Sequence, residues 1–128
     1  MNKETFREYL DALESVDTEA LTTRFYHEDF EFRAGDTTMD RAGLLEFERS
    51  LKSMADFRFD VRQIVADESG IAIDTTATFE ILRGGDLRNI GLARKGERWK
   101  FHQAIFYTLR DGRISRINVN VASVEKIH

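Results

Sequence analysis

Few side chains in this sequence have the chemistry of a catalytic or metal-binding group, and they are widely spaced. The histidines His27, His102 and His128 fall at no spacing typical of metal ligands, and a metal site needs at least three ligands that converge. The chain has no cysteine, which excludes disulfides, thiolate ligands and a cysteine nucleophile. Gly84-Gly85 is followed by neither a helix nor a Lys-Ser or Lys-Thr pair, so it is not a phosphate-binding loop. We therefore expect neither a metal nor another cofactor.

Most of the remaining polar candidate residues lie in the stretch from residue 97 to residue 122. Its centre, Arg110-Asp111-Gly112-Arg113, predicts a hairpin turn, because glycine tolerates the positive φ that a tight turn needs. Side chains alternate along a strand, so one face of the run before the turn carries Trp99, Phe101, Gln103, Ile105, Tyr107 and Leu109, and the other carries Lys100, His102, Ala104, Phe106 and Thr108. Both faces hold apolar residues, so we expect helices to cover one and a second subunit to cover the other.

Three helices are predicted in the first half of the chain by apolar residues at helical spacing. Two of them follow an aspartate, Asp17 or Asp40, that can accept a hydrogen bond from the first helical turn. The inward-facing residues are Phe6, Tyr9, Leu10 and Leu13 in the first helix, Leu21 and Phe25 in the second, and Leu44, Leu45, Phe47, Leu51 and Met54 in the third. Helices followed by antiparallel strands predict an α+β fold.

The segments between and after these helices alternate in polarity as strands do. Strands are predicted at 30–33, 57–66 and 71–81, in addition to the hairpin. Charged residues mostly stay at the surface, so we interpret 26–29, which includes His27, as an exposed turn. We expect a polar loop at 34–40 and a long loop with some strand character at 87–96.

Length and composition bound the possible classes of protein. The 128 residues fit a single domain spanning 1–128. The net charge is -4 and the basic residues are scattered, which argues against nucleic acid or a membrane surface as partner. No apolar run approaches the roughly 20 residues of a membrane span, and the charged N-terminus is not a signal peptide. With the lack of cysteine, these features predict a cytoplasmic protein.

Local motifs along nearly the whole chain carry a family resemblance. They are Tyr9 to Leu13 with Asp17, Phe25 to Phe32, Gly43 with Leu44 to Phe47, and Phe106 to Ile114. In these motifs and in the order of its elements, the sequence resembles the nuclear transport factor 2-like superfamily, in its SnoaL-like polyketide cyclase and ketosteroid isomerase branch. The resemblance implies a cystatin-like, cone-shaped roll, in which a strongly curved, mainly antiparallel sheet packs around three N-terminal helices. It does not select a function.

The resemblance also implies a deep apolar cavity at the open end of the cone. Gln103 has the strand parity to orient a ligand there, whereas His102 lies on the opposite face. An aromatic wall with few polar groups is typical of a site for a small apolar ligand, but the same rings would equally fill a core. The expected lining is Thr75, Ala77, Phe79, Trp99, Phe101, Gln103, Ile105 and Tyr107 from the strands, with Tyr9, Phe25 and Phe47 from the helices.

Ketosteroid isomerases use a tyrosine on the first helix, a carboxylate base after the first strand and a protonated acid in the sheet. Tyr9 matches the tyrosine, and its phenol would donate a hydrogen bond to a developing oxyanion; the alternative is a packed ring with a hydrated hydroxyl. Asp36 is the nearest candidate base, if its loop folds over the cavity; the alternative is a solvated turn residue. Ile105 stands where the second acid is expected, so the isomerase machinery is incomplete.

Asn118 and Asn120 lie in the last strand, where they alternate with the apolar Ile117, Val119 and Val121. Two amides on one face can bind a substrate or position a water, and SnoaL-like cyclases tend to place functional polar residues in this strand. The amides can equally lie on a wet sheet surface or pair across a dimer. A bulge after Gly112 would exchange the two faces.

Three functions remain open at this point. The first is a small cofactor-independent enzyme, of isomerase, cyclase, dehydratase or hydrolase type, in which Tyr9 and Asp36 act on an apolar, oxygen-bearing molecule such as a polyketide or terpenoid. The second is a non-catalytic ligand-binding or dimerisation module. The third is a purely structural, partner-binding domain, which predicts a filled cone with no cavity. A buried ionisable side chain in the cavity would favour the enzyme. We also expect a homodimer through the outer sheet face, which includes His102, Ala104, Phe106, Val119 and Val121.

Overall fold

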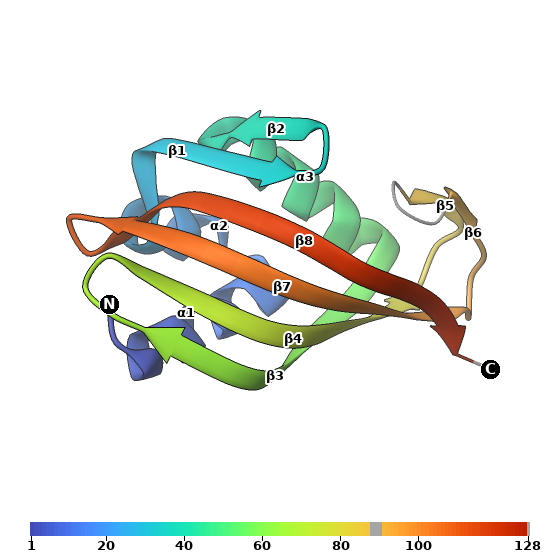
Figure 1. Ribbon diagram of the computed structural model, residues 1–128. Helices are drawn as coiled ribbons and strands as arrows, with labels where there is room; N and C mark the ends of the chain where they lie inside the picture. Colours follow the sequence, from blue (N-terminus) through green and yellow to red (C-terminus); the bar gives the residue numbers. More distant parts are fainter. Residues whose placement is uncertain (88–90, 128) are drawn as a thin grey trace.

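The computed structural model describes residues 1–87 and 91–127, which form helical segments and a large curved sheet (Figure 1). The helical segments are α1 (Lys3–Ser15), α2 (Thr18–Ala20) with the π-helical turn Leu21–Phe25, and α3 (Arg41–Met54). The strands are β1 (Tyr26–Ala34), β2 (Thr37–Asp40), β3 (Ala55–Ala66), β4 (Gly70–Ile81), β5 (Gly85–Leu87), β6 (Gly91–Ala93), β7 (Arg98–Arg110) and β8 (Arg113–Ile127). In this described part, no helix is long and apolar enough to cross a membrane.

Short polar side chains fix where the helices begin. Asp17 accepts a hydrogen bond of 3.1 Å from the backbone N–H of Ala20, and Asp40 accepts one of 2.8 Å from that of Gly43. Asn2 does the same for α1. These bonds satisfy N–H groups that have no partner inside a helix. Both predicted N-caps, Asp17 and Asp40, are confirmed.

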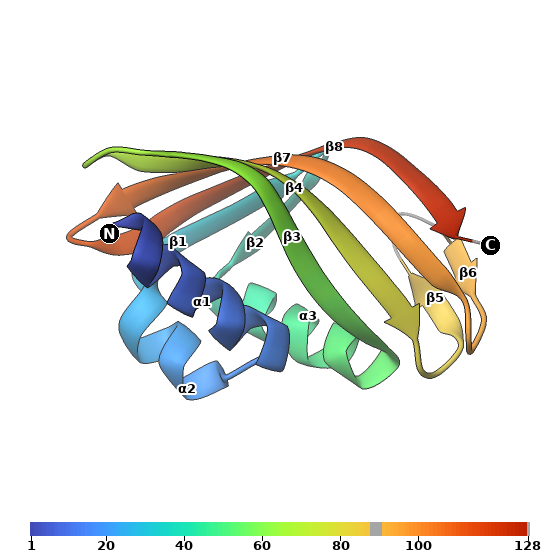
Figure 2. The ribbon, with the colours of Figure 1, turned by 90° about the horizontal axis from the view of Figure 1, so that it is seen from below.

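The sheet has six strands in the order β2-β1-β8-β7-β4-β3. Strand β1 runs parallel to β8, and the other neighbours are antiparallel. Figure 2 shows the sheet bending over the helices, which all lie on its concave side, while the separate β5–β6 hairpin projects at one end. The predicted α+β architecture, with a curved and mainly antiparallel sheet, is confirmed.

The β7–β8 connection is the tight turn that Asp-Gly predicts. Asp111 and Gly112 have φ values of 54° and 75°. Two central residues with positive φ define a type I′ turn, whose twist matches that of the strands on either side. This turn lets β7 and β8 pair over almost their whole length.

Two expectations for the first strand are wrong. Residues 26–29 are not an exposed turn, because β1 begins at Tyr26, which is fully buried, and His27 is also buried. The expected loop at 34–40 contains β2, which pairs with residues 31–34 of β1. The mostly polar sequence of 34–40 did not predict a strand, because a short edge strand depends more on pairing with its neighbour than on its own sequence pattern. The strand character expected within 87–96 is confirmed, because Leu87 ends β5 and residues 91–93 form β6. Residues 88–90 lie outside the described part.

A β-bulge decides which face of β8 meets the helices. The pairing skips Ser115, since Leu109 faces Ile114 and Thr108 faces Arg116. The extra residue exchanges the two faces of the strand from that point on. Asn118 therefore pairs with the exposed Phe106 on the convex side, and Asn120 follows it there, while Ile117, Val119 and Val121 face the concave side.

The apolar core lies between the concave face of the sheet and the helices. Its main cluster joins α1, the π-helical turn and α3 to residues of β1, β3, β4, β7 and β8. A second cluster, at the end where β5 and β6 project, contains Ala55, Ile81, Leu87 and Ala93. Residues of both clusters also line a cavity.

Candidate functional site

A cavity of about 600 Å³ lies under the concave face of the sheet. Its wall is largely apolar and is supplied by α1, α3 and the strands β1–β5, β7 and β8. A cavity of this size and character suits a small apolar molecule. The lining residues are Tyr9, Leu13, Phe32, Ala34, Thr37, Met39, Leu44, Phe47, Glu48, Ser50, Leu51, Met54, Phe57, Phe59, Phe79, Asp86, Leu87, Phe101, Gln103, Ile105, Tyr107, Ile117, Val119 and Val121.

Glu48 is a buried carboxyl group in this wall. It lies on α3, in the helical stripe that also carries Leu44 and Leu51, and its side chain is only 5% exposed. The Tyr26 hydroxyl donates a hydrogen bond of 2.8 Å to Oε2 of Glu48. The other oxygen, Oε1, is buried without a partner. One carboxyl oxygen is thus held by the protein, and the other has no hydrogen-bond donor.

Burial raises the pKa of Glu48 to about 8, although the hydrogen bond from Tyr26 acts in the opposite direction. Desolvation disfavours the charged carboxylate, so the neutral acid persists far above the usual range. At pH 7 the side chain is therefore mostly protonated and can donate a proton, and it becomes a base as the pH rises past 8.

Tyr9 and Tyr26 extend the hydrogen-bonded group. Their hydroxyl oxygens are 3.2 Å apart. The single hydroxyl proton of Tyr26 goes to Glu48, so Tyr9 donates to Tyr26. Burial raises the pKa of both phenols well above their usual range. The result is a chain Tyr9→Tyr26→Glu48, of which Tyr9 and Glu48 line the cavity.

Aromatic contacts hold this chain in place. The Tyr9 ring meets the rings of Phe25, Tyr26 and Tyr107 edge to face, at centroid distances of 5.6, 5.8 and 5.9 Å. Such T-shaped pairs favour one ring orientation. Tyr107 is itself buried in the cavity wall, and burial raises its pKa. The hydroxyls are therefore presented by packed rings that have little freedom to rotate.

The structure brings most of the predicted site residues to one cavity. Gln103 and Tyr9 lie in its wall, together with Phe47, Phe79, Phe101 and Tyr107. Phe25 packs behind Tyr9, and Trp99 packs against the second apolar cluster, so neither is part of the lining. Their roles in binding stay predictions.

Three further predicted site residues lie outside the lining. Asp36 is exposed in the turn between β1 and β2, next to Gly35, whose φ is 56°. The turn keeps this aspartate in solvent instead of folding it over the cavity. Asn118 and Asn120 lie on the convex face because of the bulge at Ser115. The structure thus does not bring Asp36 to Tyr9.

Glu48 and Tyr26 were not predicted as site residues. Glu48 follows Leu44 by four positions and precedes Leu51 by three, so it lies on the buried face of its helix. A glutamate at an apolar position of a helical stripe was the available signal. Tyr26 was hidden because the start of β1 was interpreted as an exposed turn.

The histidines have other surroundings. On the convex face, His102 Nδ1 is 3.3 Å from Thr76 Oγ1, and His102 Nε2 is 3.4 Å from Glu125 Oε1. Within residues 1–87 and 91–127, no three histidine, cysteine, aspartate or glutamate side chains cluster as metal ligands. His128 lies outside these ranges.

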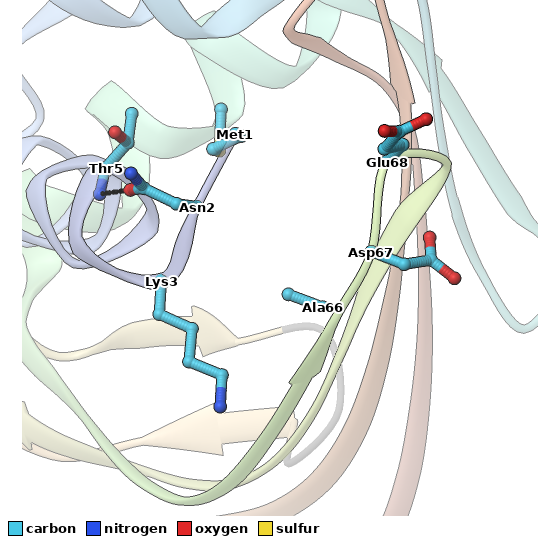
Figure 3. Close-up of a pocket in the computed structure, with 7 residues that line it drawn as sticks. All are labelled: Met1, Asn2, Lys3, Thr5, Ala66, Asp67 and Glu68. Atoms are coloured by element: carbon cyan, nitrogen blue, oxygen red, sulfur yellow. Dashed lines mark hydrogen bonds between the residues drawn. The ribbon is translucent and has the colours of Figure 1, made fainter.

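A second depression, of about 610 Å³, opens between the start of α1 and the β3–β4 turn (Figure 3). It is lined by a mixture of polar, charged and apolar residues, which are Met1, Asn2, Lys3, Thr5, Ala66, Asp67 and Glu68. Asp67 accepts hydrogen bonds from the backbone N–H groups of Ser69 and Gly70, so its carboxylate stabilises the turn. Asn2 caps α1. These side chains have structural partners, so the depression is not a candidate site.

The fold and cavity define a nuclear transport factor 2-like α+β domain. Residues 6–117 match the family model of the SnoaL-like domain, and the chain belongs to this family. No curated protein matches the chain significantly.

Solved structures of the same fold include enzymes of several kinds. IdmH from Streptomyces antibioticus, a putative polyketide cyclase, is 20% identical, with a TM-score of 0.71 over 93% of this chain and 90% of that one. An LEH-like epoxide hydrolase from M. tuberculosis is 18% identical, with a TM-score of 0.70 over 92% and 80%. TsrD from Streptomyces laurentii is 13% identical, with a TM-score of 0.75 over 95% and 91%. At these identities the likeness shows the fold alone.

Proposed function

We propose that this protein is a small cofactor-independent enzyme that acts by acid–base chemistry on an apolar, oxygen-bearing molecule, with Glu48 as the proton donor and acceptor. The observation that carries the proposal is the buried Glu48 carboxyl in the cavity wall, with Oε1 unpartnered and with a raised pKa. A buried ionisable group in an apolar pocket is typical of catalytic sites. It is also the feature that distinguishes an enzyme from a passive pocket.

The geometry supports a specific sequence of proton movements. Neutral Glu48 donates its proton from Oε1 to an oxygen of the bound molecule, and the carboxylate that remains is stabilised at Oε2 by the hydroxyl of Tyr26. Tyr9 supports Tyr26 in turn. The carboxylate then takes a proton from a neighbouring atom of the substrate or from water, which restores the neutral acid. Isomerisation, cyclisation, dehydration and epoxide opening all need such a step.

The comparisons support this class of reaction. The related folds include a putative polyketide cyclase and an epoxide hydrolase, and a putative ketosteroid isomerase from Kribbella flavida is 18% identical, with a TM-score of 0.65 over 91% of this chain and 74% of that one. All three names describe chemistry at or beside an oxygen-bearing carbon. For this chain we infer the same substrate class, since the wall offers many apolar groups and few polar ones.

The test is turnover by the wild type and by Glu48→Gln, measured by product analysis on a panel of apolar enones, epoxides and polyketide-like ketones. Loss of a general acid lowers kcat about 10²- to 10⁴-fold. The matched control is Glu46→Gln, because Glu46 is exposed on the same helix. We expect wild-type kcat to fall as the pH rises through about 8, where Glu48 loses its proton. Unchanged turnover in Glu48→Gln contradicts the proposal.

The alternative is a non-catalytic ligand-binding module of the same fold. The observation that favours it is the apolar character of the wall, in which Glu48 and Asp86 are the acidic side chains. This alternative predicts that a ligand binds and leaves unchanged. Binding without turnover at any pH between 5 and 9 would select it.

We also propose that the convex face of the sheet forms a homodimer. Val65, Ala72 and Phe106 lie in one row across β3, β4 and β7, and the side chains of Val65 and Phe106 are 60% and 52% exposed. An apolar row of this kind is unusual on a monomer surface. The interface differs from the expected one, because Val119 and Val121 face the cavity.

A further inference from the structure

Gln103 presents a second polar atom without a partner on the cavity wall. Its side chain comes from the middle of β7, and its Oε1 is buried with no hydrogen-bond donor in reach. A buried acceptor that lacks a donor is rare in folded proteins, because the loss of hydration is not offset. The described chain supplies no hydrogen-bond donor for this oxygen, so the donor would have to come from a bound molecule.

The neighbours of Gln103 do not provide that partner. It pairs with Thr75 on one side and Val121 on the other. The Thr75 hydroxyl donates to the backbone oxygen of Asp60 at 2.9 Å, so its proton is already used. The next residues on the same face of β7 are Phe101 and Ile105, which are apolar. A water bound here would find few of the two to four polar partners that hold buried water.

Gln103 and Glu48 approach the cavity from different sides. Glu48 lies on α3, beneath the sheet, and Gln103 lies on β7, within the sheet (Figure 2). Both line the same cavity, and each has a buried oxygen without a donor. The rest of the cavity wall is largely apolar. A molecule in contact with both would therefore carry polar groups at two separate points on an apolar body.

We propose that Gln103 determines specificity by accepting a hydrogen bond from a hydroxyl or N–H group of the ligand, distinct from the oxygen that faces Glu48. The ligand is thus a small, largely apolar molecule that carries an acceptor oxygen and a separate hydrogen-bond donor. This inference rests on the proposed function for its choice of cavity and for the contact at Glu48. It extends that function by naming the second polar group that the substrate carries.

A ligand that lacks the donor leaves Gln103 Oε1 unpaired in the complex. Sites built to receive a donor discriminate strongly against analogues without one, because the buried acceptor then stays without a hydrogen bond. One lost hydrogen bond of this kind weakens binding by about tenfold or more. A pocket that merely encloses apolar surface would show no such preference.

The experiment uses two fluorescent probes that differ in one methyl group, 6-acetyl-2-naphthol and its O-methyl ether. Each has a carbonyl that can accept from neutral Glu48, but only the naphthol has a donor for Gln103. Dissociation constants are measured by fluorescence titration at pH 7 for the wild type, Gln103→Leu and Gln103→Met. The matched control is Gln63→Leu, because Gln63 is exposed on β3. Circular dichroism checks that each variant folds, and the methionine variant preserves the side-chain length if leucine does not.

The wild type and Gln63→Leu are expected to bind the naphthol at least tenfold more tightly than its ether. Gln103→Leu and Gln103→Met are expected to bind both probes equally. The inference is overturned if the wild type binds both probes with the same affinity, if neither probe binds, or if the preference survives in the Gln103 variants. None of these outcomes decides the proposed function, which fails instead if Glu48→Gln leaves turnover and its pH profile unchanged.

Discussion

The hydroxyl of Tyr26 donates to Oε2 of Glu48 at 2.8 Å and so joins the first residue of β1 to the middle of α3. Both side chains are buried, Tyr26 completely and Glu48 to all but 5%. The bond holds the carboxyl group in one orientation and leaves Oε1 without a donor. Because Glu48 carries a pKa of about 8, this pair links the stability of the fold to pH as well as shaping the site.

Replacing Glu48 by glutamine should stabilise the protein at alkaline pH. The unfolded chain releases the proton near the ordinary value of 4.5 and the folded chain only near 8, so between these values the unfolded state binds fewer protons. The contribution of Glu48 to the free energy of unfolding is fully present below pH 4.5. It is lost as the pH rises to 8, at up to about 1.4 kcal/mol per pH unit. Urea unfolding at pH 5, 6, 7 and 8 measures this slope.

The Glu48→Gln variant should lack that slope and gain an advantage of order 4 kcal/mol over the wild type by pH 8, relative to pH 4.5. Glu46→Gln, on the exposed side of the same helix, should retain the slope of the wild type. Parallel pH dependences in the wild type and Glu48→Gln would mean that Glu48 is already ionised in the folded state at neutral pH.

Removing the Tyr26 hydroxyl should raise the pKa of Glu48 further. The hydrogen bond from Tyr26 favours the carboxylate and partly opposes the effect of burial, so Tyr26→Phe leaves burial unopposed. The stability loss should be about 1–3 kcal/mol, because the phenol of Tyr9 and the carboxyl of Glu48 both lose a partner. The pH-stability curve should stop falling at a higher pH than in the wild type.

Tyr9→Phe is the comparison for this prediction. Tyr9 contacts Tyr26 but makes no described hydrogen bond to Glu48. Its loss should cost about 0.5–1.5 kcal/mol and should change the Glu48 titration less than Tyr26→Phe does. A larger titration shift in Tyr9→Phe than in Tyr26→Phe would contradict the order Tyr9→Tyr26→Glu48 of the hydrogen bonds.

The sequence predicted the fold well because its elements are specified locally. Helical apolar spacing, the caps Asp17 and Asp40, and the Asp111-Gly112 turn each act over a few residues, and each is confirmed. The site was predicted less completely. Alternation alone does not reveal a bulge, so the extra residue at Ser115 reversed the faces of Asn118 and Asn120.

Glu48 was not predicted as a site residue for a different reason. A glutamate among leucines on a helix is ordinarily assigned to the surface, since charged residues are rarely buried. Its burial depends on Tyr26, which lies 22 positions earlier and reaches it only through the tertiary fold. Long-range partners of this kind cannot be inferred from local spacing. The apolar lining was predicted better for β7 than for β4. Alternation along β7 correctly placed Phe101, Ile105 and Tyr107 in the wall, whereas Thr75 and Ala77 of β4 are not part of it.

The homodimer prediction is tested on the convex row of Val65, Ala72 and Phe106. Phe106→Asp places a charge at the β7 end of this row and should convert a dimer to a monomer in sedimentation velocity at micromolar concentration. Leu92→Asp is the matched control, because Leu92 is 72% exposed on β6, in the separate two-stranded hairpin. A wild type that sediments as a monomer at these concentrations would refute the dimer.

Arg113 should position Tyr26, and through it Glu48. Its Nη2 donates to the backbone oxygens of Thr22 and Tyr26, at 2.8 and 2.6 Å, and so ties the start of β8 to the π-helical turn and the start of β1. Arg113→Met keeps much of the side-chain volume but removes both bonds. Bonds from a charged donor contribute about 1.5–3 kcal/mol each in favourable cases, so we expect a stability loss of about 2–4 kcal/mol.

A purely structural role for Arg113 would lower stability and leave the titration of Glu48 where it is. If Arg113 also positions Tyr26, the stability curve of Arg113→Met should level off at a different pH from that of the wild type. The reason is that Tyr26 would no longer be held against Oε2 of Glu48. The control is Arg116→Met, since Arg116 is exposed on the same strand. If Arg113→Met and Tyr26→Phe shift the titration in the same direction, and Arg116→Met does not, the start of β8 controls the ionisation of a carboxyl group on α3.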